Sequence, residues 1–236
     1  MASIQAPAEL YRSKRLLYRA PEDSAEDREF IQYSILNDST IQTMSTMRLK
    51  RPQHKASAED FIKRFQQAIL GVLICLPAPN PSENGDTKTG SETKSSIRAN
   101  HTTESIPIGH LSIFSVQGED TGHHRNVMMG LSFAEGYRGR GYGGEAVNWA
   151  LDWAFMHAGF HRMCISAFSF NHNALKLYRK LGFVEEGRER EAVRHFRGWH
   201  DIINLSMLEH EWEALRGIRS NQSDTIPSSL AEPINQ

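Results

Sequence analysis

The sequence predicts an α+β protein built around one mixed β-sheet. Short apolar runs with strand character alternate with segments whose apolar residues recur at helical spacing. Their order is a strand, two helices, a run of strands, a helix, a strand, a helix and two strands, without an internal repeat. The length of 236 residues fits one domain with additions.

The first half of the domain is predicted to contain two strands and two helices. Residues 13–19 form a short mixed strand. Ser24 and Asp27 have the spacing of a capping box before an apolar-spaced run, and a second such pair begins another helix at Ser57. Residues 71–76 are apolar and bounded by prolines, which is typical of a buried strand.

A break in composition follows. Residues 77–105 contain a single Val, Leu, Ile, Met or Phe residue, Ile97. Such a segment buries too little apolar surface to compensate for the entropy lost on ordering. We therefore expect a disordered insertion between two strands, within a domain over 13–216 that follows an N-terminal extension (1–12) and precedes a flexible tail (217–236).

The second half of the domain is predicted to alternate strands with two helices. A glycine-rich turn opens the first helix, whose apolar stripe runs from Ala146 to Phe155 and which ends at Gly159. A polar, basic loop is expected between the last two strands. The predicted strands are 108–116, 127–133, 161–168, 183–186 and 201–208, and the second helix is 173–181.

Composition and charge exclude several classes of protein. The 27 Lys and Arg residues nearly balance 28 Asp and Glu residues, so no general affinity for nucleic acid or a membrane surface is expected. The longest dense apolar stretch, 68–76, is far shorter than the roughly 18 residues of a membrane span. Cys75 and Cys164 form neither a disulfide framework nor a metal-ligand spacing, and no signal-peptide pattern opens the chain. We expect a soluble, cytoplasmic protein without a bound metal.

The glycine-rich turn, Tyr-Arg-Gly-Arg-Gly-Tyr-Gly-Gly-Glu over 137–145, predicts an anion site. Glycines allow close approach to the backbone, and the free N–H groups of a first helical turn point at the ligand. Arg138 and Arg140 would add positive charge for a phosphate. The glycines also satisfy the dinucleotide fingerprint, but residues 161–173 lack its acidic residue, and no Walker lysine follows. The anion is thus neither NAD nor a nucleoside triphosphate; a tight turn without a ligand is the alternative.

Three blocks of sequence resemble the GNAT superfamily of acyl-CoA-dependent N-acetyltransferases. The first is Arg-x-x-Gly-x-Gly over 138–143, and the second is Asn-x-x-Ala-x-x-Leu-Tyr-x-Lys-x-Gly-Phe over 171–183. The third, over 186–212, is similar to the subgroup that acts on ribosomal-protein N-termini and small amines. The resemblance covers most of 13–212 outside the insertion. It implies a mixed, mostly antiparallel central sheet flanked by helices on both faces.

The resemblance also implies a site for acetyl-CoA as the acyl donor. The backbone of the strand before the turn would pair with the pantetheine arm, the turn would hold the pyrophosphate, and an asparagine would bind the cofactor near its reacting end. The implied cofactor-binding residues are Leu131, Ser132, Phe133, Arg138, Gly139, Arg140, Gly141, Tyr142, Gly143, Gly144 and Asn171.

Tyr178 is the implied catalytic residue, near the thioester sulfur. Attack of an amine on a thioester expels a thiolate, which a phenol can protonate as a general acid. The alternative is that Tyr178 is an ordinary core aromatic residue. We expect direct attack in a ternary complex, because no cysteine lies where a covalent acyl intermediate would need one.

The sequence does not identify a general base. Relatives that acetylate protein N-termini often carry a glutamate five residues before the asparagine of the second block, where this chain has Ser166. His110 and Glu135 lie near the relevant strands, but such residues are more often structural or solvated. His123 and His124 could form a metal pair, yet no third ligand accompanies them. Without a strong base the chain is better suited to an α-amine, about a tenth to a fifth neutral at pH 7, than to a lysine, about 0.04 % neutral.

Two functions of different classes stay open. The first is an acetyl-CoA-dependent N-acetyltransferase that acts on a protein or peptide N-terminus or on a small amine, with a homodimer left open. The second is a catalytically silent acyl-CoA-binding regulatory module. Asn171 and Tyr178 favour the enzyme.

Overall fold

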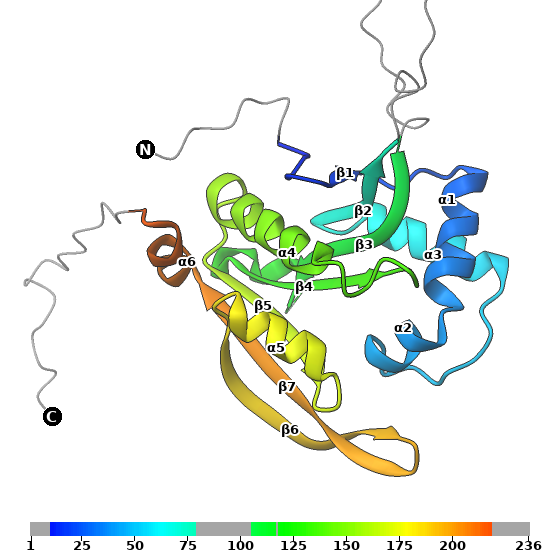
Figure 1. Cartoon of the computed structure of the whole chain (residues 1–236). Helices are drawn as coiled ribbons and strands as arrows, with labels where there is room; N and C mark the ends of the chain where they lie inside the picture. Colours follow the sequence, from blue (N-terminus) through cyan, green and yellow to red (C-terminus); the bar gives the residue numbers. More distant parts are fainter. Residues whose placement is uncertain (1–9, 79–104, 117, 219–236) are drawn as a thin grey trace, which may run out of the picture.

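The computed structural model describes residues 10–78, 105–116 and 118–218 (Figure 1). It contains the strands β1 (Leu17–Arg19), β2 (Leu70–Pro77), β3 (Ser105–Ser115), β4 (Asn126–Phe133), β5 (Arg162–Phe168), β6 (Val184–His195) and β7 (Gly198–Leu208). They form one seven-stranded sheet in the order β1-β2-β3-β4-β5-β7-β6. Only β4 and β5 are parallel neighbours among these strands. The predicted α+β class with a mixed, mostly antiparallel sheet is confirmed.

Helices cover both faces of this sheet (Figure 1). The main core lies between the sheet and the pair α4 and α5, and a smaller core lies between β2 and the pair η2 and α3. The helical segments are α1 (Ala25–Glu29), the π-helical η2 (Phe30–Leu36), α2 (Ser39–Met44), α3 (Lys55–Gln66), the 3₁₀ segment η4 (Glu119–His124), α4 (Tyr142–Asp152), the π-helical η5 (Trp153–His157), α5 (His172–Lys180) and α6 (Glu209–Arg216).

The predicted apolar stripe of α4 anchors the main core. Its side chains recur on one face of the helix, and the stripe continues into η5. All of its members are buried: Ala146, Val147, Ala150, Leu151, Ala154 and Phe155. Burial of this stripe against the sheet holds the first turn of α4, and the glycines before it, next to the end of β4.

The two predicted helix starts have different outcomes. Ser24 caps α1, because its hydroxyl accepts the Asp27 N–H at 3.2 Å. The capping box predicted at Ser57 is wrong: α3 already begins at Lys55, and its N-cap residue His54 makes no side-chain cap. The helix α2 was not predicted, since none of its residues is buried and it lacks an apolar repeat.

The loop predicted between the last two strands is also wrong. β6 and β7 continue as a hairpin to a two-residue turn formed by Phe196 and Arg197. Most side chains of β6 are exposed, so the strand lacks the alternating apolar pattern by which a half-buried strand is detected. Backbone pairing with β7 holds it instead, and the hairpin extends beyond the helices (Figure 1).

Parts of the predicted organisation lie outside the described residues: 1–9 of the extension, 79–104 of the insertion and 219–236 of the tail. The two ends predicted for the insertion, Pro77 and Ser105, are paired with each other in β2 and β3. Within the described ranges, no helix is long and apolar enough to cross a membrane.

Candidate active site

A gap opens between the two parallel strands at the centre of the sheet. β4 and β5 pair at only three positions, Asn126–Met128 with Arg162–Cys164. Beyond them, β4 stays paired with β3 through Phe133, and β5 stays paired with β7 through Phe168. The facing edges of β4 and β5 therefore present backbone groups that no described strand pairs. An extended ligand can bind such an edge as an added strand would.

The register shows which residues of β4 face this gap. The Ala134 N–H donates to the Ile108 carbonyl at 2.9 Å. Hydrogen-bonded pairs alternate along an antiparallel ladder, so Ser132 also bonds to β3 through its main chain. Leu131 and Phe133 turn their N–H and C=O groups toward the gap. Of the three residues predicted to line a pantetheine arm, these two face the gap with their backbone, and the Phe133 carbonyl there already accepts a hydrogen bond from Arg138.

The glycine-rich turn follows β4 directly and meets the gap at its open end. Gly136, Gly139 and Gly141 have φ values of +77°, +75° and +82°, which side chains disfavour. Gly141 is the N-cap of α4 and provides no side chain for its first N–H groups. A Cβ on Gly139 would meet no atom within 4 Å, so the turn is open there. Free N–H groups at an open helix N-terminus form an anion site.

The next two glycines have a packing role. A Cβ on Gly143 would lie 3.3 Å from the Leu177 side chain, and one on Gly144 would lie 3.4 Å from it. Their hydrogens let α4 approach α5 closely. Tyr142, which follows Gly141 in the chain, lies with its ring under the Arg15 guanidinium. The guanidinium carbon is 4.6 Å from the ring centroid.

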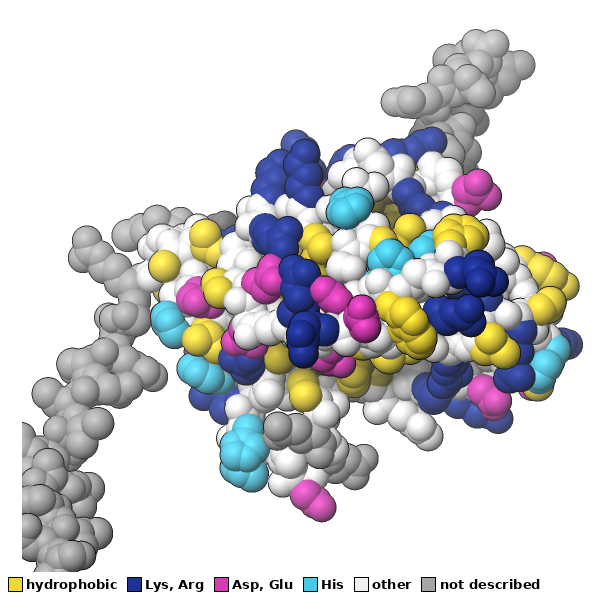
Figure 2. All heavy atoms as spheres, turned by 90° about the horizontal axis from the view of Figure 1, so that it is seen from below, with side chains coloured by type: hydrophobic (Ala, Val, Ile, Leu, Met, Phe, Trp, Pro, Cys, Tyr) yellow, Lys and Arg dark blue, Asp and Glu magenta, His cyan; other side chains and the backbone are white. Residues whose placement is uncertain are grey.

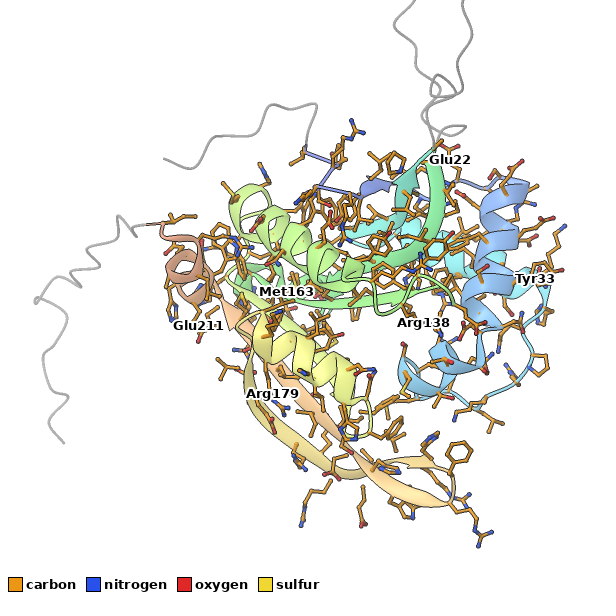
Figure 3. The ribbon with its side chains drawn as sticks, viewed as in Figure 1. Glu22, Tyr33, Arg138, Met163, Arg179 and Glu211 are labelled. Carbon is orange, nitrogen blue, oxygen red and sulfur yellow. The ribbon has the colours of Figure 1, made fainter. Side chains whose placement is uncertain are left out.

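The two arginines predicted to bind phosphate have different surroundings. Arg138, which is labelled in Figure 3, donates from Nε to the Phe133 carbonyl at 2.8 Å and forms an ion pair with Asp38. Asp38 also caps α2 by accepting the Ile41 N–H at 2.9 Å, so Arg138 ties the turn to α2. Arg140 is exposed, near the Tyr137 ring, and has no ion-pair partner among the described residues. The side chain of Arg140 is thus the more available for a phosphate.

Arg15 is a site residue that sequence analysis missed. Its guanidinium lies 2.7 Å from Glu145 in the first turn of α4 and donates to the Arg140 carbonyl at 3.1 Å. Burial raises the pKa of Glu145, but hydrogen bonds from Ser13 and Arg15 outweigh burial and lower it. Arg15 lies 125 residues before Arg140, so no local spacing could have indicated this contact.

Tyr178 lies on the α4–α5 side of the sheet. It belongs to the main core with Ile165 and Ala167 of β5, and its side chain is 8 % exposed. Burial raises the pKa of Tyr178 to about 12, so the phenol keeps its proton at neutral pH. Its hydroxyl is not hydrogen-bonded to any described residue. Asn171 caps α5, with its side-chain oxygen accepting the Ala174 N–H at 3.3 Å.

The opposite face of the sheet is polar at the gap. Side chains alternate between faces along each strand, so Ser132 and Ser166 share the face opposite Tyr178. Ser166, at the position where relatives that acetylate protein N-termini often carry a glutamate, donates to the Asn204 side chain at 2.7 Å. Asn204 donates in turn to Glu189 of β6 at 2.8 Å. At the gap, one face of the sheet is therefore polar, and the opposite face carries the Tyr178 phenol.

The other candidate bases and metal ligands are placed differently. His110 is buried edge-on against Phe61 and Phe65, with ring centroids 5.2 Å away in each case. Burial lowers its pKa to about 4, so it is a weak base at neutral pH. Glu135 is exposed in the turn after β4. His123 and His124 lie together in η4, and no described cluster of three ligands includes them.

The chain resembles known proteins in sequence and in fold. The family model for an acetyltransferase (GNAT) domain matches residues 15–184. YokL of Bacillus subtilis, named as an uncharacterized N-acetyltransferase, is 30 % identical over 87 residues, which are 37 % of this chain and 49 % of YokL. The chain thus spans about half the length of that relative. YdaF of Bacillus subtilis, named provisionally as a ribosomal N-acetyltransferase, is 27 % identical over 173 residues, or 71 % of this chain and 93 % of YdaF.

A solved structure shows the same fold. It is the crystal structure of spermidine N-acetyltransferase from Vibrio cholerae in complex with CoA and spermine. It matches with a TM-score of 0.62 and 18 % identity, covering 85 % of this chain and 99 % of that one.

Proposed function

Because this chain belongs to the GNAT acetyltransferase family, we propose that it transfers an acetyl group from acetyl-CoA to a primary amine. The observation that carries the proposal is the gap between β4 and β5, which ends at the glycine-rich turn. A strand edge followed by an open helix N-terminus suits a ligand with an amide-bearing arm and a pyrophosphate, and acetyl-CoA has both.

We assign the parts of acetyl-CoA to this geometry. Leu131 and Phe133 would pair with the pantetheine arm. The N–H groups from Gly139 to Gly144 would hold the pyrophosphate, with positive charge from Arg140. Asn171 would lie near the reacting end; its side-chain oxygen already caps α5, which leaves its amide N–H groups for the ligand.

The transfer would proceed by direct attack of the amine on the thioester carbonyl. The amine would reach the gap from the polar face, and Tyr178 would protonate the departing thiolate from the other face. A covalent acyl-cysteine is not supported, because Cys75 is buried and Cys164 donates its thiol hydrogen to Asn126 at 3.3 Å, at the paired end of the gap.

The acceptor is proposed to be an amine that loses its proton readily. Ser166 is no base at neutral pH, and His110 has too low a pKa to be a strong one. Without a base, about a tenth to a fifth of an α-amine is neutral at pH 7, whereas only about 0.04 % of a lysine side chain is neutral. A protein or peptide N-terminus or a small amine of low pKa therefore fits best.

The test is release of free thiol from acetyl-CoA by the purified chain with a panel of peptides, polyamines and amino sugars. We expect amine-dependent release with at least one acceptor and an acetylated product detectable by mass. Tight binding of CoA with no release for any amine would overturn the proposal and leave a silent acyl-CoA-binding module.

A further inference from the structure

A surface segment bridges the polar face of the sheet. Ser45, at the end of α2, lies 3.3 Å from Ser132 of β4, hydroxyl to hydroxyl. Five residues later, the Lys50 ammonium lies 3.2 Å from the ring of His195 at the tip of the β6–β7 hairpin. The chain between them therefore runs from the gap to the hairpin and borders the side from which an amine would enter. We call residues 45–51 and 192–200 together the rim.

The rim exposes large apolar side chains. Leu49 is 86 % exposed and Met47 is 65 % exposed, while Phe196 and Trp199 on the hairpin are 92 % and 59 % exposed. Single exposed apolar residues are common, but a group of them beside a site marks a surface for another molecule. These four apolar side chains offer more contact surface than a small amine could cover.

The rim is also strongly cationic. It contains five Lys or Arg residues (Arg48, Lys50, Arg51, Arg194 and Arg197) and no Asp or Glu. Among the described residues none of the five has a carboxylate partner. Burial together with the charges of Lys50 and His200 lowers the pKa of His195 at its centre. Figure 2, which views the molecule from below, shows Lys and Arg side chains on this face beside exposed hydrophobic side chains and beside Asp and Glu side chains.

The backbone at the hairpin tip is strained. Phe196 and Arg197 have φ values of +43° and +66°, in the left-handed region where two-residue hairpin turns usually place Asn and Gly. A bulky residue there costs free energy. The Phe196 side chain is 92 % exposed and contacts only the His195 ring and Lys50 among the interactions found for its ring, so burial in a core does not offset that cost.

We propose that the rim binds a polypeptide acceptor whose residues next to the reactive amine are acidic and apolar. This inference rests on the proposed acetyl transfer and specifies its substrate. Guanidinium groups would pair with carboxylates of the acceptor, while Leu49, Phe196 and Trp199 would contact its apolar side chains. A polyamine carries charge of the same sign as the rim, so the rim repels it.

The test compares three acceptors of one length. The first peptide has Asp, Glu and Leu after a free N-terminal Ser, the second has Lys in place of Asp and Glu, and the third has Ala. The variant R51E/R197E reverses two charges of the rim. The hydrogen bonds found for Arg51 use its main chain, so the substitution of its side chain breaks none of them. K63E is the matched control, since Lys63 is exposed on α3, outside the rim.

We expect wild-type kcat/KM to be highest for the acidic peptide. R51E/R197E should lower it by about tenfold for that peptide, raise it for the lysine peptide and leave the alanine peptide within about twofold. Phe196→Ser should raise KM for the acidic peptide with kcat unchanged. K63E should change none of these values. High salt should reduce the preference for the acidic peptide.

Equal rates on all three peptides, or faster acetylation of spermidine than of any peptide, would refute the inference while leaving acetyl transfer intact. Absence of transfer to every amine would refute the proposed function itself. If R51E/R197E instead converts a dimer to a monomer without changing peptide rates, the rim is covered by a second copy. If the rim binds single-stranded RNA more tightly than the acidic peptide, the partner class is wrong.

Discussion

Replacing Tyr178 by Phe removes one hydroxyl and keeps the ring that packs in the main core. If the phenol protonates the departing thiolate, kcat should fall by about 10²- to 10⁴-fold, which corresponds to roughly 2.7–5.4 kcal/mol of transition-state stabilisation. KM for acetyl-CoA should change much less, because the lost interaction exists only in the transition state.

The structure also sets the expected effect of this substitution on stability. The Tyr178 hydroxyl is not hydrogen-bonded to any described residue, so no partner loses its bond. The free energy of unfolding should therefore change by less than about 1 kcal/mol. Because burial raises the pKa of Tyr178 to about 12, its ionisation should not limit the wild-type rate below pH 10.

The assay is thiol release at saturating amine and varied acetyl-CoA, with melting temperature as the check on folding. Phe183→Leu serves as a control, since it alters an aromatic neighbour of Tyr178, 5.9 Å away between ring centroids, without touching the proton donor. A kcat of Tyr178→Phe within about threefold of the parent would remove Tyr178 from the mechanism, since general acid catalysis is worth at least about 10²-fold.

Three further predictions concern the turn and the buried imidazole. Gly141→Val should weaken CoA binding at least about tenfold by calorimetry, because a β-branched residue resists a φ of +82°; unchanged affinity in a folded protein would exclude the turn as the pyrophosphate site. Arg138→Ala should lower the melting temperature, because it removes the partner of Asp38, whereas Arg140→Ala should weaken CoA binding without changing stability; the reverse pattern would contradict the two roles. Burial lowers the pKa of His110 from 6.5 to about 4, so the unfolded chain takes up a proton at a higher pH than the folded chain does. The free energy of unfolding should therefore fall by about 3 kcal/mol as pH falls from 6.5 to 4. Urea unfolding of His110→Leu should show a smaller loss over that range, and an equal loss would place the titrating group elsewhere.

The rim shows what average composition does not describe. A net charge of −1 over the whole chain predicts no general affinity for nucleic acid or a membrane surface, but it says nothing of how charges are distributed over the surface. Of the five acids of the β6–β7 hairpin, Glu185 and Asp201 pair with Arg188, and Glu186 pairs with Arg162 of β5. The five cations of the rim come from two segments that lie more than 140 residues apart in the chain, and Lys50 and His195 bring them together.

Local sequence determined the features that depend on neighbours in the chain. The stripe of α4 predicts a buried helix because residues three and four apart share a face. The glycines before it predict a turn with free N–H groups because only glycine takes positive φ freely, and the structure has both. The second predicted helix, 173–181, likewise corresponds to α5, whose N-cap in the structure is Asn171.

Tertiary structure alone decided the rest of the candidate site. The gap exists because β4 and β5 pair at three positions and then separate, and pairing between strands has no signal in either strand's own residues. Arg15 pairs with Glu145, and Asp38 pairs with Arg138, in contacts that join residues 130 and 100 positions apart in the chain. Ser166 of β5 likewise bonds to Asn204 of β7. A sequence reports which side chains share a helix face or a strand face. Only the packing of the helices on the assembled sheet decides which of those faces contact each other.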